Sequence, residues 1–521
     1  MKPSAWKLIV LLLVFSAGAS AQLRIEVSFP ATLHSGPITG RVYLNLGPTG
    51  QLFGADVNGL LPEAVAVVDN SAAGFPILAL KDVPPGDYSI KATLCIYTEF
   101  HREDGHTIWA HLDQGEGQNP ESSPGNLFSN TQTVHIDPAY PSAVRLTLAQ
   151  VVPPRVMPAD TALVRHVKIQ SALLTKFWGQ PIYIGASVLL PGDYDRHPDQ
   201  HYPAIYHQFH FNPGAPFGYS DSGPRANSGF SKDWNADDFP RAIAVTFQHP
   251  TVYYDDSYAV NSANNGPYGD ALTKELIPYL ESHFRMIPEA RARTLTGGST
   301  GGWEALALQV YYPDVFGGTW VFCPDSIDFS RYLTLDIYND DNGFVRPGVR
   351  PAAAVVLASD ERPMMRSPEG QTTRTLREQT QMEDALGSKS RSGGQLAGWD
   401  SVYGPVGDDG YPKPLWDHRK GKIDKEVAQY MKDHGYDLAR YIELHWLELG
   451  PKLAGKMHFY VGDMDNWFAN LAVYRMESLL TKLNARATFT YGPRQGHMWY
   501  PMSDSELVRS MVNTMNGTQG R

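Results

Sequence analysis

Between residues 22 and 154, short runs of alternating apolar and polar residues are separated by turn-forming residues. Alternation with a period of two is typical of strands that bury one face. The clearest runs are Leu23–Val27, Gly40–Leu44, Tyr88–Ala92 and Val144–Leu148, and Pro84-Pro85-Gly86-Asp87 is one of the turns. We predict an N-terminal antiparallel β-sandwich over residues 22–154. Such a domain either binds a glycan or cell-wall polymer or serves only for packing and spacing.

From residue 155 the pattern changes to strands that alternate with helices. Runs rich in β-branched and aromatic residues predict strands at Ile182–Leu190, Ala204–Tyr206, Ala242–Phe247, Arg293–Thr296, Thr319–Phe322, Met457–Val461 and Thr488–Tyr491. Leu272, Leu276, Leu280 and Phe284 mark one face of a helix, which Pro278 is expected to kink. This alternation predicts an α/β fold, with a mostly parallel sheet built from residues 155–325 and 456–521 and covered on both faces.

Residues 326–455 form a long insertion that this sheet does not require. Insertions at the rim of a sheet often form a cap or lid. The segment is rich in aromatic residues, namely Tyr332, Tyr338, Trp399, Tyr403, Tyr411, Trp416 and Trp446. An aromatic cap would suit a bulky acyl ester that is partly apolar or bears a sugar, whereas the alternative is that these side chains form the core of the cap itself.

Two shorter features lie inside the insertion. The pattern predicts helix over residues 425–447, with a break near Gly435. The acidic run Asn339–Gly343 does not have the spacing of an EF-hand calcium loop, so we interpret it as a solvated turn.

The first residues have the pattern of a secretory signal peptide. Lys2 and Lys7 precede the apolar run Leu8–Phe15, and Ala19-Ser20-Ala21 suits cleavage before Gln22. The apolar run is too short to span a bilayer. We therefore expect removal of residues 1–21 and a secreted or periplasmic protein without a membrane span.

Charge and cysteine content restrict the partners. Loss of the two lysines in residues 1–21 changes the formal net charge from −11 to −13, and the chain contains no basic run. Nucleic acid and anionic membranes are therefore not expected as partners. The two cysteines, Cys95 and Cys323, have no metal-ligand spacing and are predicted to be buried free thiols, with a disulfide between them as the alternative.

The segment Gly297-Gly298-Ser299-Thr300-Gly301 has the pattern Gly-x-Ser-x-Gly between a predicted strand and a predicted helix. With 47 glycines in 521 residues the motif alone decides little. The flanking elements favour a nucleophile elbow, because a sharp strand-to-helix turn exposes the serine hydroxyl and the glycines permit close approach of the backbone. The backbone N–H of Thr300, at the start of the helix, is then an expected oxyanion donor.

Two further segments, Gly462-Asp463-Met464-Asp465 and Gln495-Gly496-His497, also follow predicted strands. The carboxyl ends of parallel strands meet at one rim of a sheet. We predict that Ser299, Asp465 and His497 form a catalytic triad, in the chain order of the α/β-hydrolases. His497 would act as general base, and the aspartate would hold its tautomer. Asp463 is the alternative acid; Asp465 is favoured because the loop needs a few residues to turn towards His497.

Together with Pro203–Tyr206, Tyr268-Gly269-Asp270 and Gly496–Trp499, these segments resemble the putative-esterase family of α/β-hydrolases, which includes feruloyl esterases, siderophore esterases and mycolyltransferases. The resemblance covers residues 165–325 and 455–510. It implies the α/β-hydrolase fold and serine hydrolase chemistry on carboxylic esters, without a metal or other cofactor.

In one place the chain departs from this family. The family usually has His-Gly after the strand that ends near Tyr206, and a backbone N–H there completes the oxyanion hole, whereas this chain has His210-Phe211. Losing one oxyanion donor typically lowers the rate by about 100- to 1,000-fold, so a working enzyme should have two. We assign the second donor to the N–H of Phe211.

The sequence therefore predicts a secreted serine hydrolase that cleaves a small-molecule or glycan-linked carboxylic ester through an acyl-enzyme on Ser299. A serine peptidase or an acyltransferase would use the same triad, and a non-catalytic binding protein could share the fold. The presence of Ser299, His497 and two candidate aspartates argues against a binding protein.

Overall fold

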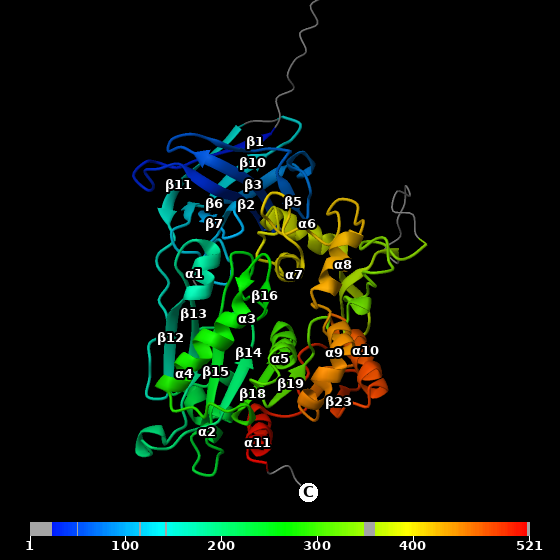
Figure 1. The fold of residues 1–521 in the computed structure, drawn as a ribbon. Helices are drawn as coiled ribbons and strands as arrows, with labels where there is room; N and C mark the ends of the chain where they lie inside the picture. The colour runs from blue at the N-terminus through cyan, green and yellow to red at the C-terminus, as the bar shows by residue number, and fades with distance from the viewer. Residues whose placement is uncertain (1–22, 49, 114–115, 141–142, 349–359, 518–521) are drawn as a thin grey trace, which may run out of the picture.

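The computed structural model describes residues 23–48, 50–113, 116–140, 143–348 and 360–517. The predicted signal peptide, residues 1–21, lies outside these ranges. A region of strands comes first, followed by an eight-stranded sheet with helices on both faces and by the largely helical insertion (Figure 1). Among the described helices, none has the length and apolar character needed to cross a bilayer.

The N-terminal region consists of strands, as predicted. They are β1 (Arg24–Ser28), β2 (Ile38–Gly47), β3 (Gln51–Leu60), β4 (Ala66–Val68), β5 (Ala73–Phe75), β6 (Gly86–Ile96), β7 (Thr98–His101), β8 (Thr107–Ala110), β9 (Leu127–Ser129), β10 (Gln132–Ile136) and β11 (Ala143–Val151). Hydrogen bonds join nine of them: eight lie along one path, β4-β1-β11-β9-β6-β2-β3-β5, and β10 pairs with β6 beside it. The alternating apolar residues face a buried core that includes Val27, Val42 and Leu94.

One pairing in this region differs from an antiparallel arrangement. Strands β1 and β11 run parallel, with Ile25 opposite Val144. They are the first and last strands of the region, so no hairpin turn links them and their relative direction is not set by a turn.

The central sheet has the order β12-β13-β15-β14-β18-β19-β22-β23. Its strands are β12 (Val164–Ser171), β13 (Ile182–Leu189), β14 (Ala204–Gln208), β15 (Ile243–Gln248), β18 (Arg293–Gly298), β19 (Gly318–Phe322), β22 (Met457–Gly462) and β23 (Ala487–Gly492). The pairs β12–β13 and β13–β15 are antiparallel, and the pairs from β15 to β23 are parallel. The predicted mostly parallel α/β sheet is confirmed, and each predicted strand is present.

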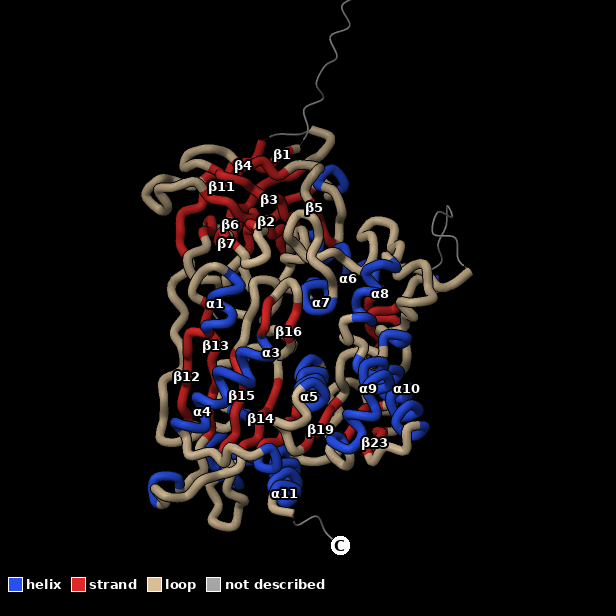
Figure 2. The backbone as a smooth tube through the Cα atoms, in the orientation of Figure 1, coloured by secondary structure: helices blue, strands red, loops and turns tan. Residues whose placement is uncertain are grey.

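Helices cover both faces of this sheet (Figure 2). One face packs against α1 (Ala172–Trp178), α3 (Tyr268–Ala271), α4 (Ile277–His283), α5 (Thr300–Tyr311) and α10 (Ala469–Lys482), and the other against α2 (Gly229–Trp234) and α11 (Asp504–Met515). The expected irregularity at Pro278 takes the form of a π-helical segment, Leu272–Leu276, immediately before α4. Proline lacks the N–H that would continue a regular helical ladder, and a π-turn accommodates the gap.

The insertion connects β19 to β22, which are neighbours in the sheet. It contains β20 (Pro363–Arg366), β21 (Thr372–Thr375), α6 (Leu376–Leu386), α7 (Gln395–Tyr403), α8 (Lys425–Asp433) and α9 (Leu438–Leu453). The predicted break near Gly435 is confirmed: this glycine has a φ of 82° in the turn between α8 and α9. In the acidic turn, Asp340 pairs with Arg362 at 2.7 Å.

The aromatic residues of the insertion form a core that continues into the sheet domain. Tyr332 packs on Trp399 with ring centroids 5.0 Å apart, and Tyr403 packs on Trp303 of α5 at 5.2 Å. Both partners of each pair are buried. These rings therefore join the insertion to the sheet domain. Their burial favours the alternative in which the aromatic side chains form a packed core.

The N-terminal region rests on the same insertion. The Arg41 guanidinium donates to the carbonyl of Ala385 at 3.0 Å, and the Tyr43 hydroxyl donates to that of Leu386 at 2.6 Å. In return, Arg391 donates to the carbonyl of Trp109 at 2.7 Å. Tyr43 is buried, so this aromatic side chain serves the contact between regions and is not an exposed platform.

Candidate active site

Ser299 lies at the sharp turn between β18 and α5. Its backbone has φ 58° and ψ −126°, a combination that non-glycine residues adopt rarely and that is found at strained functional turns. A Cβ on Gly297 would lie 2.2 Å from the carbonyl oxygen of Gly301, and one on Gly301 would lie 2.2 Å from that of Gln208. Both glycines are therefore required for the backbone to close around the serine.

The structure brings the three predicted triad residues together. His497 Nε2 lies 3.0 Å from Ser299 Oγ, and His497 Nδ1 lies 2.7 Å from Asp465 Oδ2. The Asp465 side chain is fully buried, whereas that of His497 is 13% exposed. The imidazole thus connects a buried carboxylate to a serine that is partly accessible.

The other carboxylate oxygen of Asp465 is also held in place. Oδ1 accepts hydrogen bonds from the backbone N–H groups of Trp467, at 2.8 Å, and Ala469, at 3.2 Å. Asn466 accepts from the N–H of His497 at 2.7 Å and so fixes the two loops relative to each other. The orientation of the carboxylate towards the imidazole is therefore set by backbone contacts.

Asp463, the alternative acid, lies in the same loop but faces a different group. Its Oδ1 accepts from the backbone N–H of Arg494 at 2.6 Å. This contact anchors the loop that leads to His497. The geometry therefore distinguishes the two aspartates, with Asp465 next to the imidazole and Asp463 at the base of the loop.

Arg366, which the sequence analysis did not identify, links the insertion to this loop. Its guanidinium donates to the backbone carbonyl of Asp465 at 2.8 Å and to that of Asp463 at 3.2 Å. It also lies over the ring of Phe468, 4.6 Å from the centroid. About 100 residues separate Arg366 from its partners, so no local spacing in the sequence could reveal the contact.

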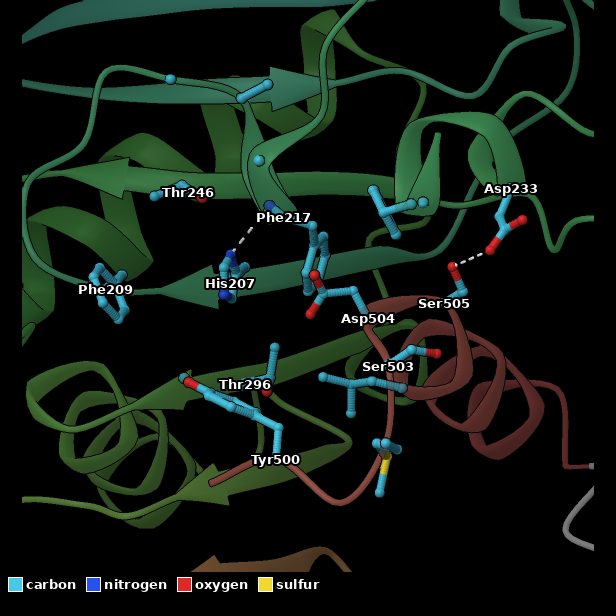
Figure 3. Close-up of a pocket in the computed structure, with 18 of the residues that line it drawn as sticks. His207, Phe209, Phe217, Asp233, Thr246, Thr296, Tyr500, Ser503, Asp504 and Ser505 are labelled. Carbon is cyan, nitrogen blue, oxygen red and sulfur yellow. Dashed lines mark hydrogen bonds between the residues drawn. The ribbon is translucent and has the colours of Figure 1, made fainter. Parts of the chain in front are cut away.

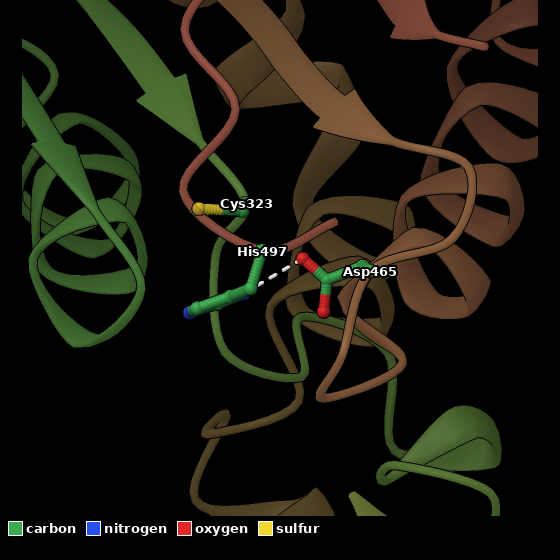
Figure 4. Close-up of side chains that lie close together, drawn as sticks. All are labelled: Cys323, Asp465 and His497. Carbon is green, nitrogen blue, oxygen red and sulfur yellow. Dashed lines mark hydrogen bonds and ion pairs between the residues drawn. The ribbon is translucent and has the colours of Figure 1, made fainter. Parts of the chain in front are cut away.

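Cys323, at the end of β19, lies beside His497 and Asp465 (Figure 4). Both cysteines of the chain are buried free thiols, as predicted. Burial lowers the pKa of His497, but the hydrogen bond to Asp465 and the neighbouring Cys323 sulfur outweigh it, so the pKa lies above its ordinary value. The site therefore favours the imidazolium that forms when the histidine accepts a proton.

The residue after the nucleophile is held by a buried polar network. The Thr300 hydroxyl donates to Asp325 Oδ2 at 3.1 Å, and the Tyr258 hydroxyl donates to the same oxygen at 2.6 Å. Gln395 and Trp399 of α7 donate to it at 3.0 and 3.3 Å. The insertion thus helps to fix the first turn of α5, where an oxyanion donor is expected.

Phe211 lines a second cavity, different from the one that Gly297 and Phe209 line. The Phe211 ring is 6.0 Å from the guanidinium carbon of Arg155, and Lys168 and Tyr183 line the same cavity. The chain segment next to the elbow is instead Gln208–Phe209: a Cβ on Gly301 would lie 2.8 Å from the backbone nitrogen of Phe209. Strand β14 ends at Gln208, opposite Gly297 of β18, and this register brings the next peptide to the elbow.

A cavity of about 590 Å³ lies beside the elbow, between the sheet and helices α2 and α11 (Figure 3). Its wall includes aromatic and apolar side chains together with a few hydroxyl and carboxyl groups. Among the residues that line it are Gly297, His207, Phe209, Phe217, Tyr500 and Asp504. Burial lowers the pKa of His207 to about 4, and its ring stacks on Phe217 at 4.3 Å. The cavity has room for an apolar group and reaches the elbow at Gly297, while Ser299, Asp465 and His497 do not line it.

Two groups of described side chains are close enough to share a metal ion. One consists of Cys323, Asp465 and His497, and therefore overlaps the triad. The other consists of His210, Asp255 and Asp256, on the loops that follow β14 and β15. In each group the ligand atoms lie within 4.8 Å of one another.

Comparison with known protein families identifies part of the chain. Residues 182–382 match the family model described as Putative esterase. The predicted resemblance to the putative-esterase family is confirmed. The matched span contains Ser299 and ends before Asp465 and His497. This family match supports ester hydrolysis.

Solved structures also align with the chain, at low similarity. A ferulic acid esterase aligns with 12% identity and a TM-score of 0.38, over 68% of this chain and 97% of its own. MPT51 (FbpC1) of Mycobacterium tuberculosis aligns with 14% identity and a TM-score of 0.36, over 69% of this chain and 100% of its own. An S-formylglutathione hydrolase from Agrobacterium tumefaciens aligns with 12% identity and a TM-score of 0.33, over 69% and 95%. A comparison with curated protein sequences finds no significant match.

Proposed function

We propose that the protein is an exported serine esterase, which cleaves carboxylic esters through an acyl-enzyme on Ser299. The observation that carries this proposal is the continuous contact from Asp465 through His497 to Ser299, at 2.7 and 3.0 Å, on a serine at a strained turn. A serine hydroxyl is a weak nucleophile until a base accepts its proton, and His497 Nε2 lies at the distance needed for that transfer.

In the first half of the reaction, Ser299 Oγ attacks the ester carbonyl while His497 Nε2 accepts the hydroxyl proton. Asp465 stabilises the imidazolium through its contact with Nδ1. His497 then donates the proton to the leaving alcohol, and the acyl group stays on Ser299. In the second half, His497 accepts a proton from water, the water attacks the acyl-enzyme, and the proton returns to Ser299.

The negative charge on the carbonyl oxygen needs donors at the elbow. We assign this role to the backbone N–H groups of Thr300 and Phe209. Thr300 begins α5, and the backbone nitrogen of Phe209 lies against the first turn of the same helix. Phe209 takes the place of Phe211 in this assignment because Phe211 lines a different cavity.

The cavity beside Gly297 is the proposed acyl pocket. Its apolar and aromatic wall suits an acyl chain or ring of a small-molecule or glycan-linked ester, and Asp504 and Ser503 add polar groups at its edge. The insertion, residues 326–455, then acts through Arg366, Gln395 and Trp399 as a support for the catalytic loops. We propose that the N-terminal domain, residues 22–154, is a packing module on that support.

The proposal is tested with purified mature protein and a panel of p-nitrophenyl esters of increasing acyl length, alongside a p-nitroanilide peptide. We expect hydrolysis of the esters, with a preference in acyl length that reflects the cavity, and its loss in Ser299→Ala. Turnover of the anilide without the esters would replace the esterase with a peptidase. Addition of a competing alcohol reports acyl transfer, because the acyl-enzyme is open to any nucleophile that fits.

A further inference from the structure

A second group of acidic and histidine side chains lies close to the elbow but outside the triad. His210 Nδ1 lies 3.2 Å from Asp255 Oδ1 and 3.5 Å from Asp256 Oδ2. Asp256 is buried, and the potential ligand atoms of the three residues lie within 4.8 Å of one another. The group therefore joins the loop after β14 to the loop after β15.

Glu304, on α5, places a third carboxyl group next to that of Asp256, outside the group of three whose ligand atoms lie within 4.8 Å of one another. It is fully buried, and neither of its carboxylate oxygens has a hydrogen-bond partner among the described residues. Burial raises the pKa of Glu304, and the neighbouring carboxylate of Asp256 raises it further. Oδ2 of Asp256 likewise has no hydrogen-bond partner within the described chain.

The nearest histidine does not satisfy Glu304. The backbone N–H of Ser257 donates to His249 Nδ1 at 3.0 Å, so the neutral ring carries its proton on Nε2. That nitrogen lies 3.7 Å from Glu304 Oε1, which is too long for a hydrogen bond. Gln208 is a second unpartnered group: its side chain points to the same face of β14 as Tyr206, and in the described structure neither amide atom has a partner.

We propose that His210, Asp255 and Asp256 bind one divalent cation, and that Glu304 supports this site through the neighbouring Asp256. Buried carboxyl groups are costly to ionise without cationic partners, and among the described residues His210 is the one imidazole that contacts both aspartates. A cation would supply further positive charge and would give the unpartnered Oδ2 of Asp256 a partner. Carboxylate oxygens with an imidazole nitrogen suit Mn²⁺ or Zn²⁺, whereas Ca²⁺ takes oxygen ligands.

The position of this site gives the cation a role in the oxyanion hole, a point that rests on the proposed function. Gln208 and His210 flank Phe209, and Glu304 lies in the helix that begins at Thr300. Through Asp256 and its neighbour Glu304, the cation would therefore hold together the two segments that carry the proposed donors. It positions these backbone groups and does not contact the substrate.

The site is tested by titrating chelator-treated mature protein with Mn²⁺ and following the free ion by electron paramagnetic resonance. We expect one Mn²⁺ per chain, and binding at least about tenfold weaker in Glu304→Gln and in Asp255→Asn. Glu304→Gln keeps the shape of a buried side chain, and Asp255→Asn changes a side chain that is partly exposed. Because the two positions differ in burial, weaker binding in both variants would not be explained by misfolding of the buried one. The control is Asp238→Asn on an exposed carboxylate, which should bind Mn²⁺ as the parent does.

Two further variants separate this site from the triad. Cys323→Ser and Ser299→Ala should both leave Mn²⁺ binding unchanged. Absence of Mn²⁺ and Zn²⁺ binding to the parent protein, or equal binding by Glu304→Gln and Asp255→Asn, would overturn the proposal in favour of a proton shared between carboxyl groups. If the protein binds the cation but hydrolyses no ester, the cation site stands and the proposed function is rejected. If it hydrolyses esters but binds no cation, the proposed function stands and the cation site is rejected.

Discussion

Two groups of acidic and histidine side chains lie near the same elbow and differ in how their polar atoms are partnered. In the triad, both oxygens of Asp465 and both ring nitrogens of His497 have partners within 3.2 Å. In the second group and its neighbour Glu304, one oxygen of Asp256 and both of Glu304 have none among the described residues. Complete pairing fixes a path for a proton, whereas incomplete pairing in a buried place leaves room for a ligand.

The largest effect is expected from Ser299→Ala. Removing the nucleophile of a triad should lower kcat by about 10⁶-fold, because His497 and Asp465 then have no hydroxyl group to activate. The measurement is p-nitrophenyl ester turnover, with thermal unfolding as the check on folding. Retention of most of the activity would remove the triad from the account, and loss of Mn²⁺ binding in the same variant would show that the two groups are not independent.

The two aspartates provide the next comparison. Asp465→Asn should lower kcat by about 10⁴-fold, because the amide no longer holds the required imidazole tautomer. Asp463→Asn keeps an oxygen that can accept the N–H of Arg494, so its effect should be much smaller. Both variants are assayed with the same ester. A larger loss in Asp463→Asn would transfer the role of the acid to that residue.

The second oxyanion donor is tested by removing a backbone N–H. Phe209→Pro should lower kcat by about 100- to 1,000-fold, since one donor is lost. Phe211→Pro changes the backbone to the same degree two residues further on and is the matched control. Circular dichroism and thermal unfolding establish that both variants are folded. If Phe211→Pro is the more damaging substitution, the original assignment of the donor to Phe211 stands.

A smaller effect is expected from the support provided by the insertion. Arg366→Met preserves packing on Phe468 but removes the donors to the carbonyls of Asp465 and Asp463. Misplacement of the acid should lower kcat by about 10- to 100-fold with little change in KM. An unchanged kcat would show that the backbone contacts of Asp465 are sufficient to hold the loop.

The pH profile should show the raised pKa of His497. Below this pKa the ring is protonated and cannot accept the proton of Ser299, so kcat/KM should rise with pH through it. The contacts with Asp465 and Cys323 outweigh burial, and the midpoint should therefore lie above the ordinary histidine value of about 6.5. Asp465→Asn removes the carboxylate that raises the pKa of His497, whereas burial still lowers this pKa. The midpoint of the pH profile of the residual activity should therefore fall. A midpoint that is equal or higher in this variant would contradict the assigned cause.

Much of the sheet domain could be predicted because its signals are local. The β-branched and aromatic composition of runs such as Ala242–Phe247 and Met457–Val461 predicts strands. The Gly-x-Ser-x-Gly motif predicts a tight turn, because the close approach of the backbone there requires glycine. The triad residues follow strand ends, and the parallel topology brings such ends to one rim. Asn466 directly follows Asp465 and could have been found from the same segment.

The remaining features depend on contacts between distant parts of the chain. Arg366 and Gln395 contact Asp465 and Asp325 from an insertion whose packing has no period in the sequence. The parallel pairing of β1 with β11 joins the first and last strands of the N-terminal region, so no turn between them sets its direction. The cluster around Glu304 combines residues from α5 and from two loops, so its burial and lack of partners become visible only in three dimensions.

The central claim is that Ser299 forms a covalent intermediate. It is tested most directly by treating the mature protein with a fluorophosphonate and mapping the modified peptide by mass spectrometry. The account predicts one adduct, on Ser299, with labelling abolished in Ser299→Ala and strongly slowed in Asp465→Asn. An adduct on another residue, or equal labelling of Ser299→Ala, would contradict the account.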